Sequence, residues 1–345
     1  MTLVDRKLRI LQAIINDFIG TAQPVGSRTI AKKYDLGISS ATIRNEMSDL
    51  EELGYLVQPH TSAGRIPSDL AYRLYVDSLM RKYEVEKKHK KIVSELLLEK
   101  IVEIDDVIKN TSGILSQLTN LTCVGLSPQF RKSKLKNIKL VQVDNDKVLL
   151  ILVSNSGVIK NIILRMQNIS QAALDEVSNL LQENLRGHTI DHLDEDLINR
   201  IKNELIQYSS TIDAIIPKLN NSFSDIDDTK IYLDGITNIF NLPEYTDINK
   251  AKKFISIIEK KELMYDLLRS GTDDDICIKI GCENEIDEIK DCSIITATYR
   301  LNGRVIGKLG VIGPTRMDYS KVVGVINYLN KTLTDNIKDI LPEIF

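Results

Sequence analysis

The first eighty residues alternate apolar and polar positions with the period of an α-helix. Apolar residues recur every three or four positions from Leu8 to Phe18, so residues 5–19 are predicted to form an amphipathic helix. A second, shorter helix is expected over Arg28–Tyr34. We expect Ser27 to be its N-cap, because serine hydroxyls accept the free N–H groups of a first helical turn.

A third helix is expected from about residue 40 to Leu53. Ser39 or Ser40 can cap its start, and Gly54 can stop it, since glycine adopts the left-handed geometry of a helix end without strain. Two helices joined by a short turn containing Gly37 are typical of a helix-turn-helix. The alternative is a set of ordinary solvated helices with no nucleic-acid role.

The third helix has two unlike faces. Ile43, Met47 and Leu50 fall on one side of it, whereas Ala41, Arg44, Asn45 and Ser48 fall on the other. Arginine and asparagine are the residue types that bond guanine and adenine edges in pairs. The acidic residues crowd the second half of the helix, and a recognition helix enters the major groove by its first half. The outward face therefore predicts contact with DNA bases.

Two short strands are predicted after this helix, over residues 55–57 and 66–67. The polar loop between them contains Ser62, Gly64 and Arg65, and the whole segment is typical of a β-hairpin wing. Such a wing can lie along a phosphate backbone or insert its arginine into a minor groove. The full order of helices and hairpin is a more specific signal of DNA binding than the helix-turn-helix alone.

The next two predicted elements are helical. Ser68 is expected to cap a helix over residues 69–81, with Leu70, Leu74 and Leu79 turned inward. A long helix is expected over residues 84–118, and a shift in its apolar stripe allows a kink or a break. It begins with a run of lysines, for which a solvated face is the simpler interpretation and phosphate contact the alternative.

The remainder of the chain has an α+β pattern. Strands are predicted over residues 121–126, 138–143, 148–153, 158–164, 231–233, 276–280, 292–300 and 304–310, and helices over 172–185, 194–219, 249–268 and 321–337. The strands between 138 and 164 are joined by short polar turns and should form an antiparallel meander. The later strands are expected to form a mixed sheet with flanking helices.

Composition excludes several classes of protein. The 345 residues carry a net charge of −3, and residues 1–66 have eight basic against seven acidic side chains, so any DNA contact must be local. No secretory signal is visible at the start, and the most apolar stretch, Val148–Val153, is far shorter than the roughly 20 residues of a membrane helix. We therefore expect a cytoplasmic protein.

Catalytic signatures are not found in the sequence. No GxGxxG after a strand, GxxxxGK[ST] or GxSxG is present, so an enzyme is not predicted. The four cysteines form no CxxC pair, and His188 with His192 lacks a third nearby ligand, so neither a metal nor a cofactor is expected.

Two segments resemble a known family. PVGSRTIAKKYDLGISSATIRNEMSDLEELGYLVQPHTSAGRIPSDLAYRLYVDSLM (Pro24–Met80) and VIGPTRMDY (Val311–Tyr319) are similar to HrcA, the heat-inducible transcription repressor family of bacterial chaperone genes. Ser68 and Ala71 stand where threonine and glycine are more usual in the family.

The resemblance implies an α+β multidomain fold. Its parts would be an N-terminal winged helix-turn-helix, a GAF-like α+β domain and an inserted α+β dimerising domain. The implied boundaries are 1–82 for the DNA-binding domain, 83–135 for a helical linker and the first part of the GAF-like domain, 136–228 for the inserted domain and 229–345 for the second GAF-like part.

The resemblance also implies a function, namely repression of chaperone operons by a homodimer bound to an inverted-repeat operator in double-stranded DNA. A GroEL-type chaperonin would keep the repressor active, heat stress would remove that support, and the operator-bound protein would be associated with the nucleoid. The alternative is a winged-helix regulator controlled by a small-molecule effector in the GAF-like domain.

Candidate site residues follow from the faces and motifs above. The DNA-binding candidates are Ser27, Arg28, Thr29, Ser39, Ser40, Thr42, Arg44, Asn45, His60, Thr61, Ser62 and Arg65. Arg316, Asp318 and Tyr319, in the second matching segment, are candidates for a regulatory contact. The alternative for these three is a salt-bridged loop that caps the last helix.

Overall fold

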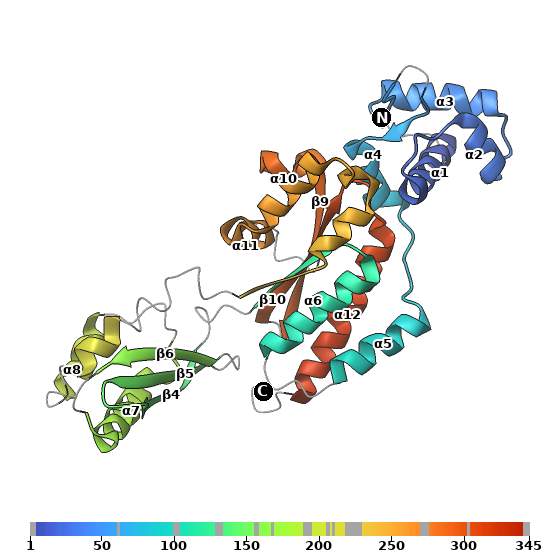
Figure 1. Ribbon diagram of the computed structural model, residues 1–345. Helices are drawn as coiled ribbons and strands as arrows, with labels where there is room; N and C mark the ends of the chain where they lie inside the picture. The colour runs from blue at the N-terminus through green and yellow to red at the C-terminus, as the bar shows by residue number, and fades with distance from the viewer. Residues whose placement is uncertain are drawn as a thin grey trace.

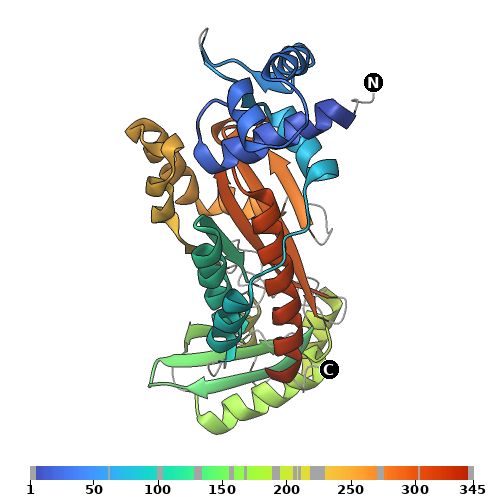
Figure 2. The same ribbon diagram turned by 90° about the vertical axis from the view of Figure 1, so that its right-hand side faces the viewer.

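The computed structural model describes residues 5–60, 63–98, 104–127, 134–154, 159–166, 169–188, 195–204, 208, 211–217, 230–269, 276–301 and 304–340. Figure 1 shows an N-terminal group of helices, a central sheet with helices, and a small separate sheet with helices of its own. In both Figure 1 and Figure 2 the small sheet lies at the opposite end of the molecule from the N-terminal group. Among the described helices, none is long and apolar enough to cross a membrane.

The N-terminal group follows the predicted order of elements. It contains α1 (Asp5–Thr21), α2 (Ser27–Lys33), α3 (Ser40–Glu52), the antiparallel strands β1 (Leu56–Val57) and β2 (Ile66–Pro67), and α4 (Asp69–Leu74). Ser39 caps α3, and its hydroxyl accepts the N–H of Thr42 at 3.1 Å. Gly54 follows the helix with a φ of 81°, a conformation that favours glycine.

Two local predictions in this group are wrong. Ser27 is the first residue of α2 rather than its cap; the cap is Gly26, which has no side chain to accept a hydrogen bond. Leu70 is 49% exposed, whereas Tyr72 is buried, and α4 continues as a π-helical turn (Tyr75–Leu79) whose first residue is buried too. Leu74 and Leu79 pack against the core as predicted, so only Leu70 departs from the expected stripe, and the large aromatic surfaces fill the face beside it.

The central sheet has five strands in the order β7, β3, β10, β9 and β8. Their bounds are Ile231–Asp234 (β7), Thr122–Leu126 (β3), Arg304–Pro314 (β10), Cys292–Leu301 (β9) and Ile276–Ile280 (β8). The predicted mixed sheet is wrong, because every pairing between these described strands is antiparallel. The connections joining β8, β9 and β10 are too short for the crossover that parallel strands require.

Helices cover both faces of this sheet. Consecutive strand residues belong to different cores: Cys123, Ile295 and Val311 pack with the helices on one face, and Val124, Ile294 and Ile312 with those on the other. The first face is covered by α6 (Ile104–Thr119) and α12 (Tyr319–Ile340), and the second by α10 (Ile248–Ile258) and α11 (Lys261–Arg269). Figure 1 shows α6 and α12 side by side along the sheet.

Three predicted long helices each correspond to two described helical segments. The segment expected at 84–118 forms α5 (Lys87–Leu98) and α6, and the segment at 249–268 forms α10 and α11. The segment at 194–219 forms α8 (Glu195–Glu204) and a second helical stretch at 211–217. Neither glycine nor proline lies between the two helical segments of any pair, so the residues that usually mark a helix end in a sequence are missing.

The small sheet is the predicted antiparallel meander. Its strands are β4 (Leu135–Gln142), β5 (Lys147–Ser154) and β6 (Ile159–Arg165), and α7 (Gln171–Leu185) packs on it with α8. The apolar core of this unit, which includes Leu140, Leu150, Leu174 and Leu181, is separate from the cores of the central sheet. The unit therefore has a hydrophobic core of its own.

Candidate nucleic-acid interface

The outward face of α3 is exposed. Arg44 and Asn45 are exposed, and neither side chain forms a hydrogen bond or an ion pair with any residue that the structure describes. Ser40 and Thr42 are half-buried at the start of the same helix, and Ile43 is fully buried beneath them. In Figure 1 and Figure 2, α3 lies at the end of the molecule farthest from the small sheet.

Basic residues of α1 neutralise the acids of α3. The ammonium group of Lys7 lies 2.6 Å from a carboxylate oxygen of Glu46 and 2.6 Å from one of Asp49. Arg6 adds a longer contact of 3.5 Å to Glu46. These contacts raise the pKa of Lys7, first through its hydrogen bond to Asp49 and then through that to Glu46. Their side chains come from positions about forty apart, so the sequence pattern does not reveal the pairing.

Arg65 holds the base of the wing rather than extending from it. Its guanidinium lies 2.8 Å from the carboxylate of Glu51 on α3, and its side chain is 21% exposed. Its backbone exchanges two hydrogen bonds of 2.9 Å with Val25, in the link between α1 and α2. A Cβ on Gly64 would lie 2.4 Å from the Val25 carbonyl oxygen, so this close approach requires glycine.

The other predicted wing and α2 residues are only partly described. His60 is exposed, whereas Thr61 and Ser62 lie outside the described residues. Arg28 and Thr29 are exposed on α2 and line a shallow hollow together with Lys32 and Lys33, while Ser27 is half-buried. The ammonium group of Lys33 is 2.5 Å from Asp17.

Arg316 connects the central domain to the N-terminal group. Its guanidinium donates to both carboxylate oxygens of Glu244, at 2.5 and 3.0 Å, and to the backbone carbonyl of Ile19 near the end of α1, at 2.5 Å. Asp318 accepts the N–H of Lys321 at 3.0 Å in the first turn of α12. The loop is therefore salt-bridged and caps the last helix, and it also contacts the N-terminal group; a regulatory role for Arg316, Asp318 and Tyr319 stays a prediction.

A second set of polar contacts joins α4 to the end of β8. The carboxylate of Asp69 accepts the N–H of Cys282 at 2.9 Å, and a Cβ on Gly281 would lie 2.0 Å from that carboxylate. Arg73 donates to both carboxylate oxygens of Glu283 and, at 2.6 Å, to the carbonyl of Ile278. Sequence reasoning missed these partners, which lie more than two hundred positions apart.

Two buried tyrosines fill the space between these contacts. The rings of Tyr72 on α4 and Tyr319 at the start of α12 are 5.6 Å apart between centroids. The Tyr319 hydroxyl donates to the Thr315 carbonyl at 2.6 Å and lies 2.7 Å from the Ser293 hydroxyl. Burial raises the pKa of both phenols, so they are neutral at physiological pH. We call this set of contacts, from Ile19, Asp69, Tyr72 and Arg73 to their partners in the central domain, the junction.

No candidate metal site is found among the described residues. No group of three or more histidine, cysteine, aspartate or glutamate side chains in that part of the chain could hold an ion. His188 is described and exposed, whereas His192 lies outside the described residues.

The sequence and the fold of this chain are similar to those of known proteins. The family model described as "HrcA protein C terminal domain" matches residues 105–323. The chain is 44% identical over 339 residues to the heat-inducible transcription repressor HrcA of Clostridium acetobutylicum, covering 98% of both chains. It is 46% identical over 344 residues to the protein of the same name from Clostridium tetani, covering 98% of this chain and 97% of that one.

One solved structure, described as a hypothetical protein, has the same fold. It aligns with a TM-score of 0.64 at 22% identity and covers 98% of this chain and 100% of its own.

The Arg73–Glu283 pair predicts a dependence of stability on pH. Burial alone would raise the pKa of Glu283, but the hydrogen bonds from Arg73 and the Ile280 N–H lower it overall. A carboxyl with a lowered folded pKa stabilises the fold above its unfolded pKa and loses that contribution as pH falls through the folded value.

We therefore expect Glu283→Gln to lower the free energy of unfolding at pH 7, with a smaller difference from wild type at about pH 3, below the unfolded pKa of a glutamate. Urea unfolding at both pH values measures this difference. Glu285→Gln, at a side chain that is 83% exposed, is the control and should change little at either pH. An equal loss at both pH values for Glu283→Gln would contradict the assignment.

Proposed function

Since this chain belongs to the HrcA family of heat-inducible transcription repressors, we propose that its N-terminal group is a winged helix-turn-helix that binds operator DNA through α3. The chain is a DNA-binding repressor and not an enzyme. The observation that carries the proposal is the outward face of α3, where Arg44 and Asn45 are exposed and unpaired among the described residues. The acids of the same helix, Glu46 and Asp49, are neutralised from behind.

Each candidate residue has a proposed role. Arg44 and Asn45 would bond base edges in the major groove, with Ser40 and Thr42 beside them. The phosphate contacts would come from Ser27, Arg28, Thr29, Ser39, His60, Thr61 and Ser62. We revise the role of Arg65: its pairing with Glu51 supports a positioning function at the base of the wing, in place of insertion into a groove.

We also propose the domain division 1–82, 83–135, 136–228 and 229–345, with a GAF-like central domain interrupted by an inserted dimerising domain. The adjacency of β3 and β7 in the central sheet supports this division. The chain leaves the sheet at Ser127 and returns at Lys230, and the N–H of Ser127 donates to the Lys230 carbonyl at 3.0 Å. An insertion between neighbouring strands leaves the sheet intact.

The open face of the meander is the proposed dimer contact. α7 covers one face, whereas the cross-strand row Val141, Leu149 and Ile163 and the pair Val153 and Ile159 point to the other. Ile163 is 66% exposed and Ile159 is 56% exposed. Exposed apolar surface of this kind marks an interaction site. A dimer also agrees with the nearly neutral DNA-binding group, because paired half-sites supply the affinity that one weakly charged module lacks.

One edge of this meander, strand β4, is covered by side chains of α7. Three side chains of α7 accept backbone N–H groups of β4: Gln182 from Ile138 at 2.7 Å, Ser178 from Leu140 at 2.9 Å, and Gln171 from Gln142 at 2.8 Å. The edge strand β4 is thereby protected from pairing with another chain. This argues against a dimer formed by pairing through β4, and the exposed isoleucines support contact through the open face of β5 and β6.

Chaperonin control is the remaining part of the proposal. We infer that a GroEL-type chaperonin maintains the repressor in the bacterial cytoplasm, and that heat-damaged proteins compete for it and lift repression at the nucleoid. The junction supports this, because it joins segments more than two hundred positions apart, so its loss in a heated chain would release the N-terminal group from the central domain. A folding assistant would restore the closed junction.

Arg44→Ala is expected to weaken specific operator binding by about 1–3 kcal/mol without loss of the fold, because one bidentate base contact disappears. Fluorescence anisotropy with an inverted-repeat operator, at stated salt, measures the change. Arg9→Ala removes the same charge from an exposed position of α1 and should have a smaller effect. Unchanged affinity for Arg44→Ala would reject α3 as the reading helix.

Ile163→Glu is expected to convert the dimer to a monomer, because the charge would have to be buried in the apolar contact. Light scattering after size exclusion gives the mass in solution. Phe240→Glu alters a side chain that is 60% exposed in the central domain and should leave the dimer intact. A dimer that survives Ile163→Glu would show that another surface is used.

Operator binding after a heat pulse tests the chaperonin. We expect purified chaperonin with ATP to restore binding to a heated sample, while ATP alone or an inactive chaperonin leaves it low. Equal recovery with and without chaperonin would remove this part of the proposal.

A further inference from the structure

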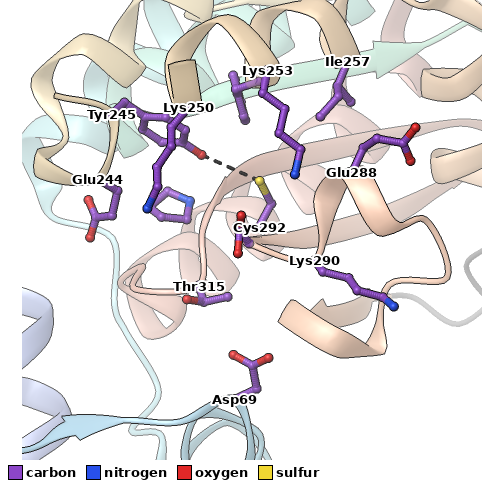
Figure 3. Close-up of a pocket in the computed structure, with 13 residues that line it drawn as sticks. Asp69, Glu244, Tyr245, Lys250, Lys253, Ile257, Glu288, Lys290, Cys292 and Thr315 are labelled. Carbon is purple, nitrogen blue, oxygen red and sulfur yellow. Dashed lines mark hydrogen bonds between the residues drawn. The ribbon is translucent and has the colours of Figure 1, made fainter. Parts of the chain in front are cut away.

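A pocket of about 300 Å³ lies beside the junction, at one end of the central sheet. Its walls come from α10, from the ends of β9 and β10, and from Asp69 at the start of α4. Figure 3 shows Lys250 and Lys253 extending from α10 on one side and Asp69 facing them from the other, with Cys292 and Thr315 between. A cavity of this size suits a small metabolite.

Two lysines of the wall form no direct pair with a described acid, although Lys253 is close enough to Asp287 to lower the pKa of that carboxyl. Lys250 and Lys253 are three residues apart on α10, so their side chains share one face. Neither forms an ion pair or a hydrogen bond with any residue of the described part of the chain. The third lysine of the pocket, Lys290, is 2.5 Å from Asp287 and is already paired.

The acids nearest the junction are occupied. The Glu244 carboxylate accepts two hydrogen bonds from Arg316, and the Asp69 carboxylate accepts the Cys282 N–H at 2.9 Å. The remaining acids, Glu288 and Asp291, are exposed. This distribution of acidic side chains favours a ligand with one negative charge, bound beside α10, over a multiply charged ligand.

The floor of the pocket is apolar and uncharged. Phe254 and Ile257 of α10 and Pro314 of β10 line it, all of them buried. The Cys292 thiol lies 3.7 Å from the Tyr245 hydroxyl, and desolvation by burial raises the pKa of Cys292 to about 11. The thiol is therefore neutral at physiological pH and does not repel an anion.

We propose that this pocket binds a small organic acid, with its single carboxylate between Lys250 and Lys253 and its apolar body against Phe254, Ile257 and Pro314. The site is distinct from the DNA-binding face and adds a small-molecule effector to the proposed repressor.

Phenylacetate is a suitable probe, and the neutral phenylacetamide is its matched control. Calorimetric titration of the full-length protein should give saturable binding of phenylacetate and at least about tenfold weaker binding of phenylacetamide, because a charge-assisted contact is lost. The melting temperature should rise with phenylacetate concentration and stay nearly constant with phenylacetamide. Neither measurement requires DNA, so failure of the repressor proposal would not affect the result.

The double variant Lys250→Gln/Lys253→Gln should lose phenylacetate binding, whereas Lys252→Gln, on the same helix but outside the pocket, should keep it. Circular dichroism should show the same helical content for both variants. Absence of saturable phenylacetate binding, binding unchanged in the double variant, or saturation by inorganic phosphate alone would overturn the proposal.

Discussion

The guanidinium of Arg316 joins two parts of the chain that are 297 positions apart and links the N-terminal group to the central domain. One side chain satisfies the Glu244 carboxylate and the Ile19 carbonyl together. Arginine suits this task, because its planar group offers several donors in fixed directions, which a lysine ammonium does not. The contacts of Arg73 and Asp69 complete the same boundary, and the Tyr72 and Tyr319 rings exclude water between them.

Charged side chains are also paired across elements within the N-terminal group. A net charge close to zero leaves little long-range attraction to phosphates, so local placement decides what DNA would meet. Lys7 and Arg65 neutralise acids of α3 from two sides, and Arg44 stays free on the outward face among the described residues. The proposed mode of action follows: affinity comes from paired base contacts in a dimer, and holding the two groups at a fixed spacing is the task of the rest of the chain.

Local features of this fold could be predicted from the sequence, and long-range ones could not. Local patterns located α1, α3, the hairpin and the meander and narrowed the cap of α3 to Ser39 or Ser40, because each depends on neighbouring residues. The outward face of α3 and the salt-bridged Arg316 segment were also visible in advance. The partners of Asp69 and Arg73 were not, since no periodicity links residues two hundred positions apart. The break between α10 and α11 lacks glycine or proline, and the pair of Arg65 with Glu51 joins residues fourteen positions apart that no local pattern links.

The central claim is that the junction fixes the direction of α3 relative to the central domain. Pulsed electron-spin distance measurement tests it most directly, with labels at Ser48→Cys on α3 and Lys252→Cys on α10, Cys282 replaced by serine, and labelled chains diluted with unlabelled protein. We predict one narrow distance distribution for this background and a broad one after Arg73→Ala and Arg316→Ala are added. A broad distribution in the unaltered junction, or an equally narrow one without the two arginines, would contradict the claim.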